Sequence, residues 1–167
     1  FSKKDQDAFK NKKLHDILQE TYDLLEHSMK IAKIMFLTDF NADNDEIYGN
    51  PNQLKQALIT VLVNANEAIK ENGEIIIKTY NPDRDHITVE IEDNGNGIPE
   101  EVLPQIFEPF FTTKQGEKGM GLGLAITHGI IKRHKGTIDI RSELNKGTSV
   151  IITLPLSKNQ NPNDHDQ

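Results

Sequence analysis

A short run at residues 93–97 has the residue types to bind a flat ligand that carries an amino group. Asp93 follows an alternating run at residues 86–92, and Gly95 and Gly97 come next. An ionised carboxylate accepts hydrogen bonds and cannot donate them, so Asp93 suits a donor such as the exocyclic amine of adenine. The glycines allow the backbone to turn sharply and to approach a ligand closely. An ordinary turn has the same residues, so this run needs support from the rest of the chain.

Two further stretches suit the phosphates of a nucleotide. Asn64 lies beside the apolar stripe of a predicted helix, and its amide oxygen is a hard ligand suited to Mg²⁺. Gly119, Gly121 and Gly123 lead into another predicted helix, where exposed backbone amides and the helix dipole favour phosphate. Taken alone, an asparagine at such a place is more often a surface amide than a metal ligand.

Two better-known glycine motifs do not fit the same residues. A dinucleotide-binding fingerprint needs a third glycine at the sixth position, directly after a strand, but Leu124 stands there and a polar loop precedes the glycines. A Walker loop needs a Gly-Lys pair, and the sequence contains none.

The periodicity of apolar residues predicts the elements that must hold these stretches together. A helix begins at about Leu14, and the cleanest helical stripe starts at the Asn50-Pro51 cap and ends at Asn72-Gly73. Residues 107–120 lack periodicity and are predicted to form a lid. The other predicted elements are strands at 35–40, 74–80, 86–92, 137–142 and 148–154, a short helix at 99–106, and a helix at 122–134.

This order predicts an α+β fold, a two-layer α/β sandwich in which helices cover one face of a mixed sheet of about five strands. Residues 14–156 are expected to form one domain. Residues 1–13, polar and rich in lysine, are expected to be a linker or the end of an upstream helix, and residues 157–167 a disordered tail.

The composition excludes several classes of protein. No apolar run approaches the roughly 18 residues of a membrane span, and no signal peptide is present. The absence of cysteine excludes disulfides and fits a reducing cytoplasm. A net charge of -7 argues against a nucleic-acid surface, and it means that a polyphosphate ligand would need a cation. Because the chain opens at Phe1 without methionine, we expect it to be a piece of a longer protein.

Taken together, the motifs resemble the ATP-binding domains of histidine kinases. Asn64, the Asp93 run, the aromatic run at 107–114 and the glycines at 119–123 are similar in order and spacing to that family's N, G1, F and G2 boxes. The closing Gly147-Thr148, with the strand after it, resembles the family's usual ending. The aromatic run looks most like the nitrogen-regulation branch of sensor kinases. The resemblance implies the Bergerat ATP-binding fold, a flexible ATP lid, and ATP and Mg²⁺ as cofactors.

The resemblance also implies a role for each matching residue. Asp93 would bind the adenine amine with help from Thr148 through water, and Asn64 would hold the Mg²⁺ that bridges the phosphates. Thr113 and Lys114 would belong to the lid, and Lys114 would reach a phosphate. The base pocket would be lined by Gly95, Gly97 and Ile98, and the phosphates would meet the amides of Gly121, Leu122 and Gly123. Other residues expected around the nucleotide are Glu67, Ala68, Phe111, Gly119 and Leu124.

Two positions depart from the family pattern. Many members carry lysine or arginine three residues after the metal asparagine, where this chain has Glu67, so positive charge must come from elsewhere, such as Lys114 or Lys118. Thr60 replaces an asparagine that often stands four residues before Asn64.

The implied function is that of the catalytic domain of a two-component sensor histidine kinase. None of the six histidines has the sequence context of a phosphoacceptor. His15 and His27 are expected on the solvent side of the first helix, and His128 and His134 as surface or packing residues. The implied partners are ATP or ADP, a histidine-bearing dimerisation domain of the same protein, and the receiver domain of a response regulator. This piece is expected to be monomeric and inactive in autophosphorylation, and the full-length protein a homodimer that is membrane-anchored or cytoplasmic.

Other functions share the same motifs. A clamp ATPase such as gyrase, a heat-shock chaperone or a mismatch-repair ATPase typically carries a glutamate base where Thr60 stands, and threonine has no comparable basicity. A serine kinase that inhibits a sigma factor differs in its acceptor, which this sequence does not contain. A non-catalytic nucleotide sensor is also compatible with the sequence, because no residue is strictly a base.

Overall fold

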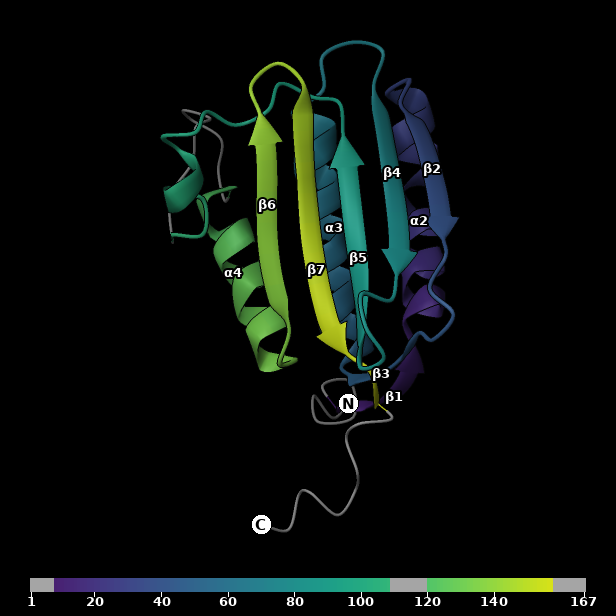
Figure 1. The fold of residues 1–167 in the computed structure, drawn as a ribbon. Helices are drawn as coiled ribbons and strands as arrows, with labels where there is room; N and C mark the ends of the chain where they lie inside the picture. Colours follow the sequence, from purple (N-terminus) through teal and green to yellow (C-terminus); the bar gives the residue numbers. More distant parts are fainter. Residues whose placement is uncertain (1–7, 109–119, 158–167) are drawn as a thin grey trace, which may run out of the picture.

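The structure, a computed structural model, describes residues 8–108 and 120–157, without the side chains of residues 120–122. Three helices cover one face of a five-stranded sheet, and a two-stranded sheet lies at one end (Figure 1). The elements are β1 Lys10–Lys13, α2 Leu14–Ile31, β2 Met35–Phe40, β3 Glu46–Gly49, α3 Pro51–Glu67, β4 Glu74–Tyr80, β5 His86–Asp93, the 3₁₀ turn η1 Leu103–Gln105, α4 Met120–Arg133, β6 Thr137–Glu143 and β7 Gly147–Pro155.

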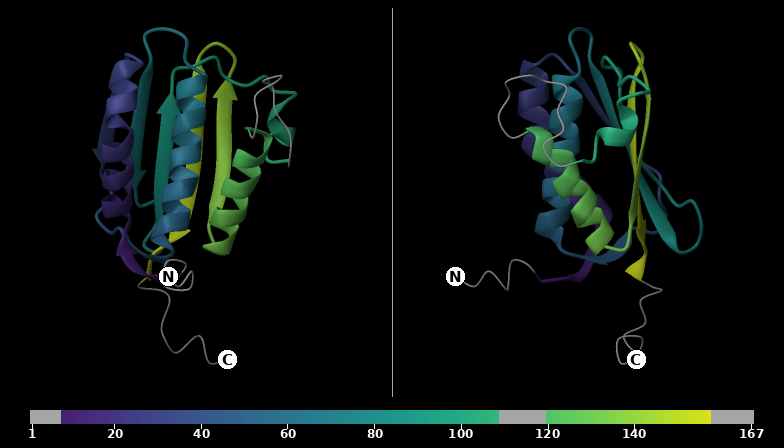
Figure 2. Two further views of the ribbon diagram at one scale, coloured as in Figure 1. Left: turned by 180° about the vertical axis from the view of Figure 1, so that it is seen from behind. Right: turned by 90° about the vertical axis from the view of Figure 1, so that its left-hand side faces the viewer.

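The predicted α+β fold and mixed sheet are confirmed. The strand order is β2-β4-β5-β7-β6, in which β2 and β4 run parallel and the other pairs run antiparallel. Figure 2 shows the three helices side by side over the sheet and, edge on, the two layers. None of the helices that the structure describes is long and apolar enough to cross a membrane.

The core lies between the helices and the alternate side chains of the strands. In a strand, successive side chains point to opposite faces, so Ile75 and Ile77 of β4 and Val89 and Ile91 of β5 share the helix-facing side and are buried. The helix α3 supplies the facing stripe, with the predicted residues Leu54, Ala57, Leu58, Val61, Leu62 and Ala65 all buried. As predicted, Asn50 caps this helix, since its side chain accepts a hydrogen bond from the Gln53 backbone N–H.

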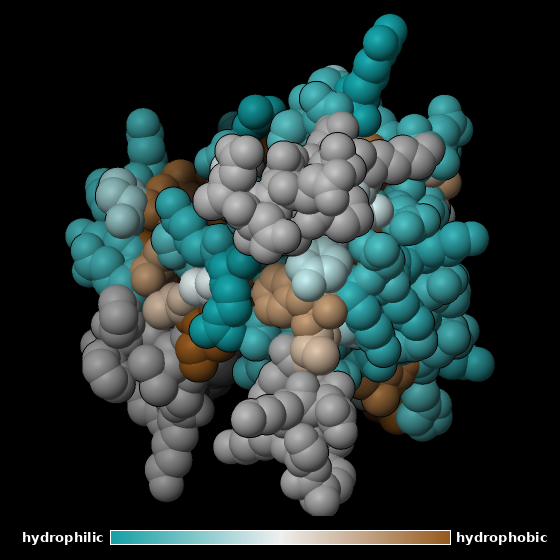
Figure 3. Space-filling view, turned by 90° about the horizontal axis from the view of Figure 1, so that it is seen from below, coloured by the Kyte–Doolittle hydropathy of each residue, from teal (hydrophilic) through white to brown (hydrophobic). Residues whose placement is uncertain are grey.

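The beginning of the chain differs from the prediction. Residues 10–13, expected to be a linker or helix end, form β1, which pairs antiparallel with β3. The pairing satisfies backbone groups that the lysine-rich sequence gives no periodic signal for. β1 and the end of β7 lie at the end of the sheet opposite to the end where β5 stops at Asp93 (Figure 1). Figure 3 shows the β1 end, where small apolar areas lie between hydrophilic side chains.

Two predicted helix boundaries are also wrong. The helix α3 ends at Glu67 rather than at Asn72, because the Ala68 carbonyl accepts a hydrogen bond from the Asn96 N–H instead of continuing the helix. The short helix expected at 99–106 is a series of turns around η1. Pro104 has no N–H to donate to a helical carbonyl, so tight bonds such as Gln105 N–H to Val102 O replace the helix.

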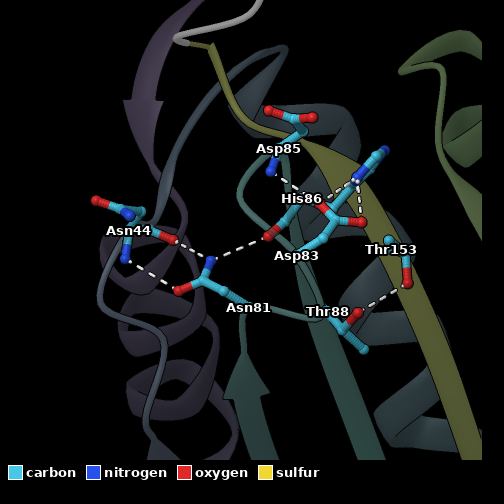
Figure 4. A network of polar contacts seen from close by, with 7 residues as sticks. All are labelled: Asn44, Asn81, Asp83, Asp85, His86, Thr88 and Thr153. Carbon is cyan, nitrogen blue, oxygen red and sulfur yellow. Dashed lines mark hydrogen bonds and ion pairs between the residues drawn. The ribbon is translucent and has the colours of Figure 1, made fainter.

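The predicted β4–β5 hairpin is confirmed, and a polar network closes it at the end away from Asp93 (Figure 4). The Asn81 amide donates to the carbonyls of Asn44 and His86, at 2.8 and 3.0 Å, so it joins the hairpin to the loop before β3. The Asp83 carboxylate accepts from the Asp85 N–H and contacts Nδ1 of His86, each at 2.8 Å. These contacts fix the register of β5, which carries Asp93 at its other end.

Two of the histidines lie in surroundings that the sequence did not indicate. His15, expected on the solvent side, is largely covered: its ring stacks on Phe40, and its Nε2 lies 2.8 Å from Thr79 Oγ1. His134 is buried at 3% exposure, and its Nε2 accepts a hydrogen bond from the Asn50 N–H. Both rings therefore join separate elements, as packing residues do.

Candidate nucleotide-binding site

A cavity of about 350 Å³ opens at the end of the sheet where β5 stops. This volume is within the range of small-molecule and cofactor sites. Its walls come from the last turns of α3, the loop after β5, the ends of β6 and β7, and α4. The lining residues are Val61, Asn64, Ala65, Glu67, Ala68, Ile91, Asp93, Asn96, Gly97, Ile98, Val102, Ile106, Leu124, Ile140, Thr148 and Val150. Most of these are apolar, so the polar groups among them stand out as candidates for specific contacts.

Asp93 is the half-buried acceptor of this cavity. It is the last residue of β5 and lies opposite Thr148 of β7. Its carboxylate accepts hydrogen bonds from the backbone N–H groups of Gly95, at 2.8 Å, and of Thr148. Burial raises the pKa of Asp93 above its ordinary value, and these two bonds oppose that shift. The ionised group is therefore poorly hydrated and gains from a ligand that donates a hydrogen bond.

The glycine loop after Asp93 is held between α3 and the β6–β7 turn. The Asn96 N–H donates to the Ala68 carbonyl at 2.9 Å, and the Asn96 carbonyl accepts from Asn145 at 2.6 Å. A Cβ on Gly95 would lie 2.6 Å from the Ala68 oxygen. Gly97 has a φ of 72°, and a Cβ there would lie 2.1 Å from the Glu143 oxygen. The glycines are thus needed for close packing on neighbouring backbone, as well as for any approach to a ligand.

The last turns of α3 bring Asn64, Glu67 and Ala68 to the cavity, as predicted. Among the described residues, none hydrogen-bonds to the side-chain amide of Asn64, so its oxygen is available to a cation. Glu67, Asp93 and the carbonyl end of α3 make this side of the cavity negative, which also fits a cation. No group of three or more His, Cys, Asp or Glu in the described ranges could hold a metal alone. A Mg²⁺ at Asn64 would therefore need phosphate oxygens and water to complete its shell.

The start of α4 forms the far wall of the cavity. Leu124 lines it, and a Cβ on Gly123 would lie 3.0 Å from the Cγ2 methyl of Thr60. Gly121 and Leu122 belong to the first turn of this helix. The remaining predicted residues, Phe111, Thr113, Lys114 and Gly119, lie outside the described residues.

The structure adds an apolar wall that sequence analysis did not assign to the site. Ile91 and Val150 lie opposite each other, two residues from Asp93 and Thr148 respectively, and so on the same face of the sheet. The strand alternation could have indicated this pair. The added lining residues are Val61, Ala65, Ile91, Asn96, Val102, Ile106, Ile140 and Val150. They form a slot suited to the faces of a planar base.

A two-layer domain whose cavity joins a buried aspartate to a glycine-led helix defines the class of ATP-binding domains found in histidine kinases. Residues 49–158 match the model of the family described as "Histidine kinase-, DNA gyrase B-, and HSP90-like ATPase". The chain belongs to this family.

Individual relatives agree with this assignment. Sporulation kinase E of Bacillus subtilis (strain 168) is 37% identical over 159 residues, which are 95% of this chain and 21% of that protein. The catalytic domain of histidine kinase ThkA superposes with a TM-score of 0.78 at 34% identity, covering 88% of this chain and 95% of that one. ThkA in complex with the response regulator protein TrrA gives a TM-score of 0.75 at 31% identity, covering 88% of this chain and 41% of that one. The chain thus spans about a fifth of the length of Sporulation kinase E and nearly all of the ThkA catalytic domain.

Proposed function

We propose that this chain binds Mg-ATP and donates the γ-phosphoryl group to a histidine on a separate dimerisation domain of its parent protein. The single observation that carries the proposal is the acceptor-only carboxylate of Asp93 at the base of an apolar cavity. Adenine presents an amine to such a group, whereas guanine presents a carbonyl at the equivalent position. The apolar walls formed by Ile91, Val150 and their neighbours would cover the faces of the base.

The phosphates would extend from the base toward Asn64 and the start of α4. There the amide oxygen of Asn64 would bind the Mg²⁺, and the backbone amides at Gly121, Leu122 and Gly123 would face the phosphates. The bound Mg²⁺ supplies charge neutralisation for the phosphoryl group. Phosphoryl transfer needs mainly such positioning and charge stabilisation from a protein, and no base is required on this chain.

The parent protein is proposed to be a two-component sensor kinase, homodimeric through its dimerisation domain, with this domain in the cytoplasm. Its phosphohistidine would pass the phosphoryl group to the receiver domain of a response regulator. The likeness to ThkA, which has been solved with TrrA, supports this part of the proposal.

The clamp ATPase remains the second candidate, and Thr60 argues against it. The Thr60 hydroxyl donates to the Gln56 carbonyl of its own helix at 2.9 Å, so it is not poised to activate water. Calorimetry of ATP and GTP with Mg²⁺, together with a phosphate-release assay, tests the proposal. We expect ATP to bind at least about tenfold more tightly than GTP, with negligible release of phosphate. Equal affinities would contradict the base site, and rapid turnover would favour the ATPase.

A further inference from the structure

Ser142, near the end of β6, joins three segments around the base of the cavity. Its Oγ accepts a hydrogen bond from the Ile98 backbone N–H at 2.7 Å. The same hydroxyl donates to the Gly147 carbonyl at 3.1 Å. Its oxygen also lies 2.7 Å from Thr148 Oγ1, where either hydroxyl could be the donor. Ser142 therefore touches the glycine loop, the β6–β7 turn and the neighbour of Asp93 at once.

The three contacts can all be satisfied by only one arrangement of hydrogens. The Ile98 N–H can only donate, and the Gly147 carbonyl can only accept. If the single hydroxyl proton of Ser142 goes to Gly147, then the Thr148 hydroxyl must donate to Ser142. The reverse direction, from Ser142 to Thr148, would take away the bond to Gly147.

In this arrangement Thr148 can offer the cavity only the lone pairs of its oxygen. Asp93, directly opposite Thr148 in the β5–β7 register, also offers only lone pairs. Two adjacent acceptors suit a ligand edge that supplies two N–H groups, or an amine with a bridging water that turns its hydrogens to the protein. A ligand with a carbonyl at this edge meets two acceptors and no donor.

We propose that Ser142 is a positioning residue that sets the preference of the cavity for the amino edge of adenine. It does so by taking the Thr148 proton and by tying Ile98 to β6. This inference rests on the proposed nucleotide function, and it assigns the preference to a residue that does not line the cavity itself.

The test compares ADP with inosine diphosphate, which carries a carbonyl in place of the amine, in the presence of Mg²⁺. In Ser142→Ala the Thr148 hydroxyl regains a free proton that can reach the inosine carbonyl. We expect the ratio of the two affinities to fall about tenfold relative to wild type. Ser142→Thr keeps a hydroxyl in the strand and is expected to restore the ratio. Calorimetry measures the affinities, and thermal unfolding without nucleotide reports folding.

A purely structural role would weaken both ligands equally and leave the ratio unchanged, and that outcome overturns the proposal. A ratio that falls in Ser142→Ala but is not restored by Ser142→Thr also overturns it. If Ser142→Ala does not fold, Thr148→Val removes the hydroxyl with little change of shape. An unchanged ratio in that variant overturns the proposal as well. Wild-type protein with no preference for ADP would instead contradict the proposed function itself.

Discussion

Gly97 packs so tightly against Glu143 that an added Cβ would lie 2.1 Å from the Glu143 carbonyl oxygen. This contact presses the glycine loop onto the β6–β7 turn, while Asn96 bonds to the end of α3. The loop that forms one wall of the cavity is therefore fixed by its neighbours before any ligand binds.

Replacing Gly97 by alanine is expected to displace this loop. Its φ of 72° and the close Glu143 carbonyl both oppose a side chain, so we expect a loss of about 1–3 kcal/mol in the free energy of unfolding and weaker nucleotide binding. Gly129 is the matched control, because it is exposed in α4 and a Cβ there meets nothing within 4 Å. Gly129→Ala should instead stabilise the domain by about 0.5–1 kcal/mol. Urea denaturation of both variants measures the difference, and similar losses would contradict the role of the contact.

Asp93→Asn is expected to separate binding from stability. The variant replaces an acceptor by an amide, so we expect at least about a hundredfold loss of ADP affinity. Because burial raises the pKa of Asp93 in the folded state, its ionisation opposes folding above that pKa. The cost disappears as the pH falls through the folded pKa toward the ordinary aspartate value of about 4.

The nucleotide-free variant should therefore unfold at a temperature no lower than wild type at neutral pH. The two unfolding temperatures should converge in acid. A lower unfolding temperature at neutral pH would show that the carboxylate stabilises the fold, contrary to this expectation.

His134 is expected to make the domain sensitive to mild acid. Its Nδ1 bonds to the Ile130 carbonyl and its Nε2 accepts from Asn50, so the neutral ring is required. Phe9 stacks on the ring, and Arg133 is the charged group nearby. Burial lowers the pKa of His134, and although the bond to Ile130 opposes this shift, the charge of Arg133 adds to it.

The sign of the effect follows from this lowered pKa. Stability should be constant above the ordinary histidine pKa of about 6.5 and should fall as the pH drops from there through the folded pKa. Urea midpoints from pH 8 to pH 5 measure the slope. His134→Phe should be less stable at pH 8 but should lose much of the slope, whereas His27→Gln, at an exposed position, should keep it. The same slope in His134→Phe would assign it to other groups.

Asn64→Ala is expected to reduce the magnesium dependence of nucleotide binding. Affinity measured in a chelator should change little, while the enhancement by Mg²⁺ should fall about tenfold or more, since a metal ligand is lost. Asn66→Ala, on the same helix but not lining the cavity, is the control. A magnesium titration identical to wild type would remove Asn64 from the metal site.

The isolated chain is expected not to phosphorylate itself. His15 is engaged by Thr79 and stacked on Phe40, and His134 is buried with both ring nitrogens bonded. Incubation with γ-labelled ATP should leave the described histidines unlabelled. Acid-labile label on His15 or His27 would contradict the need for a separate acceptor domain.

The local patterns of the sequence were sufficient for most of the fold. The apolar stripe of α3, its Asn50 cap and the alternation of β4 and β5 were predicted correctly, because each depends on neighbours within a few turns or residues. The motif residues Asn64, Asp93 and Thr148 were also predicted together, and the structure places all of them at one cavity.

Other features depend on residues far apart in the chain and have no local signal. The β1–β3 pairing, the early end of α3 at Glu67 and the bond of His134 to Asn50 each require a partner that only folding brings near. Ser142 is the clearest case, since a serine in a strand predicts nothing until Ile98 and Thr148 lie within hydrogen-bonding distance. Residue types and their order thus determined which chemistry this chain can carry, and tertiary packing decided which protons and backbone groups face the ligand.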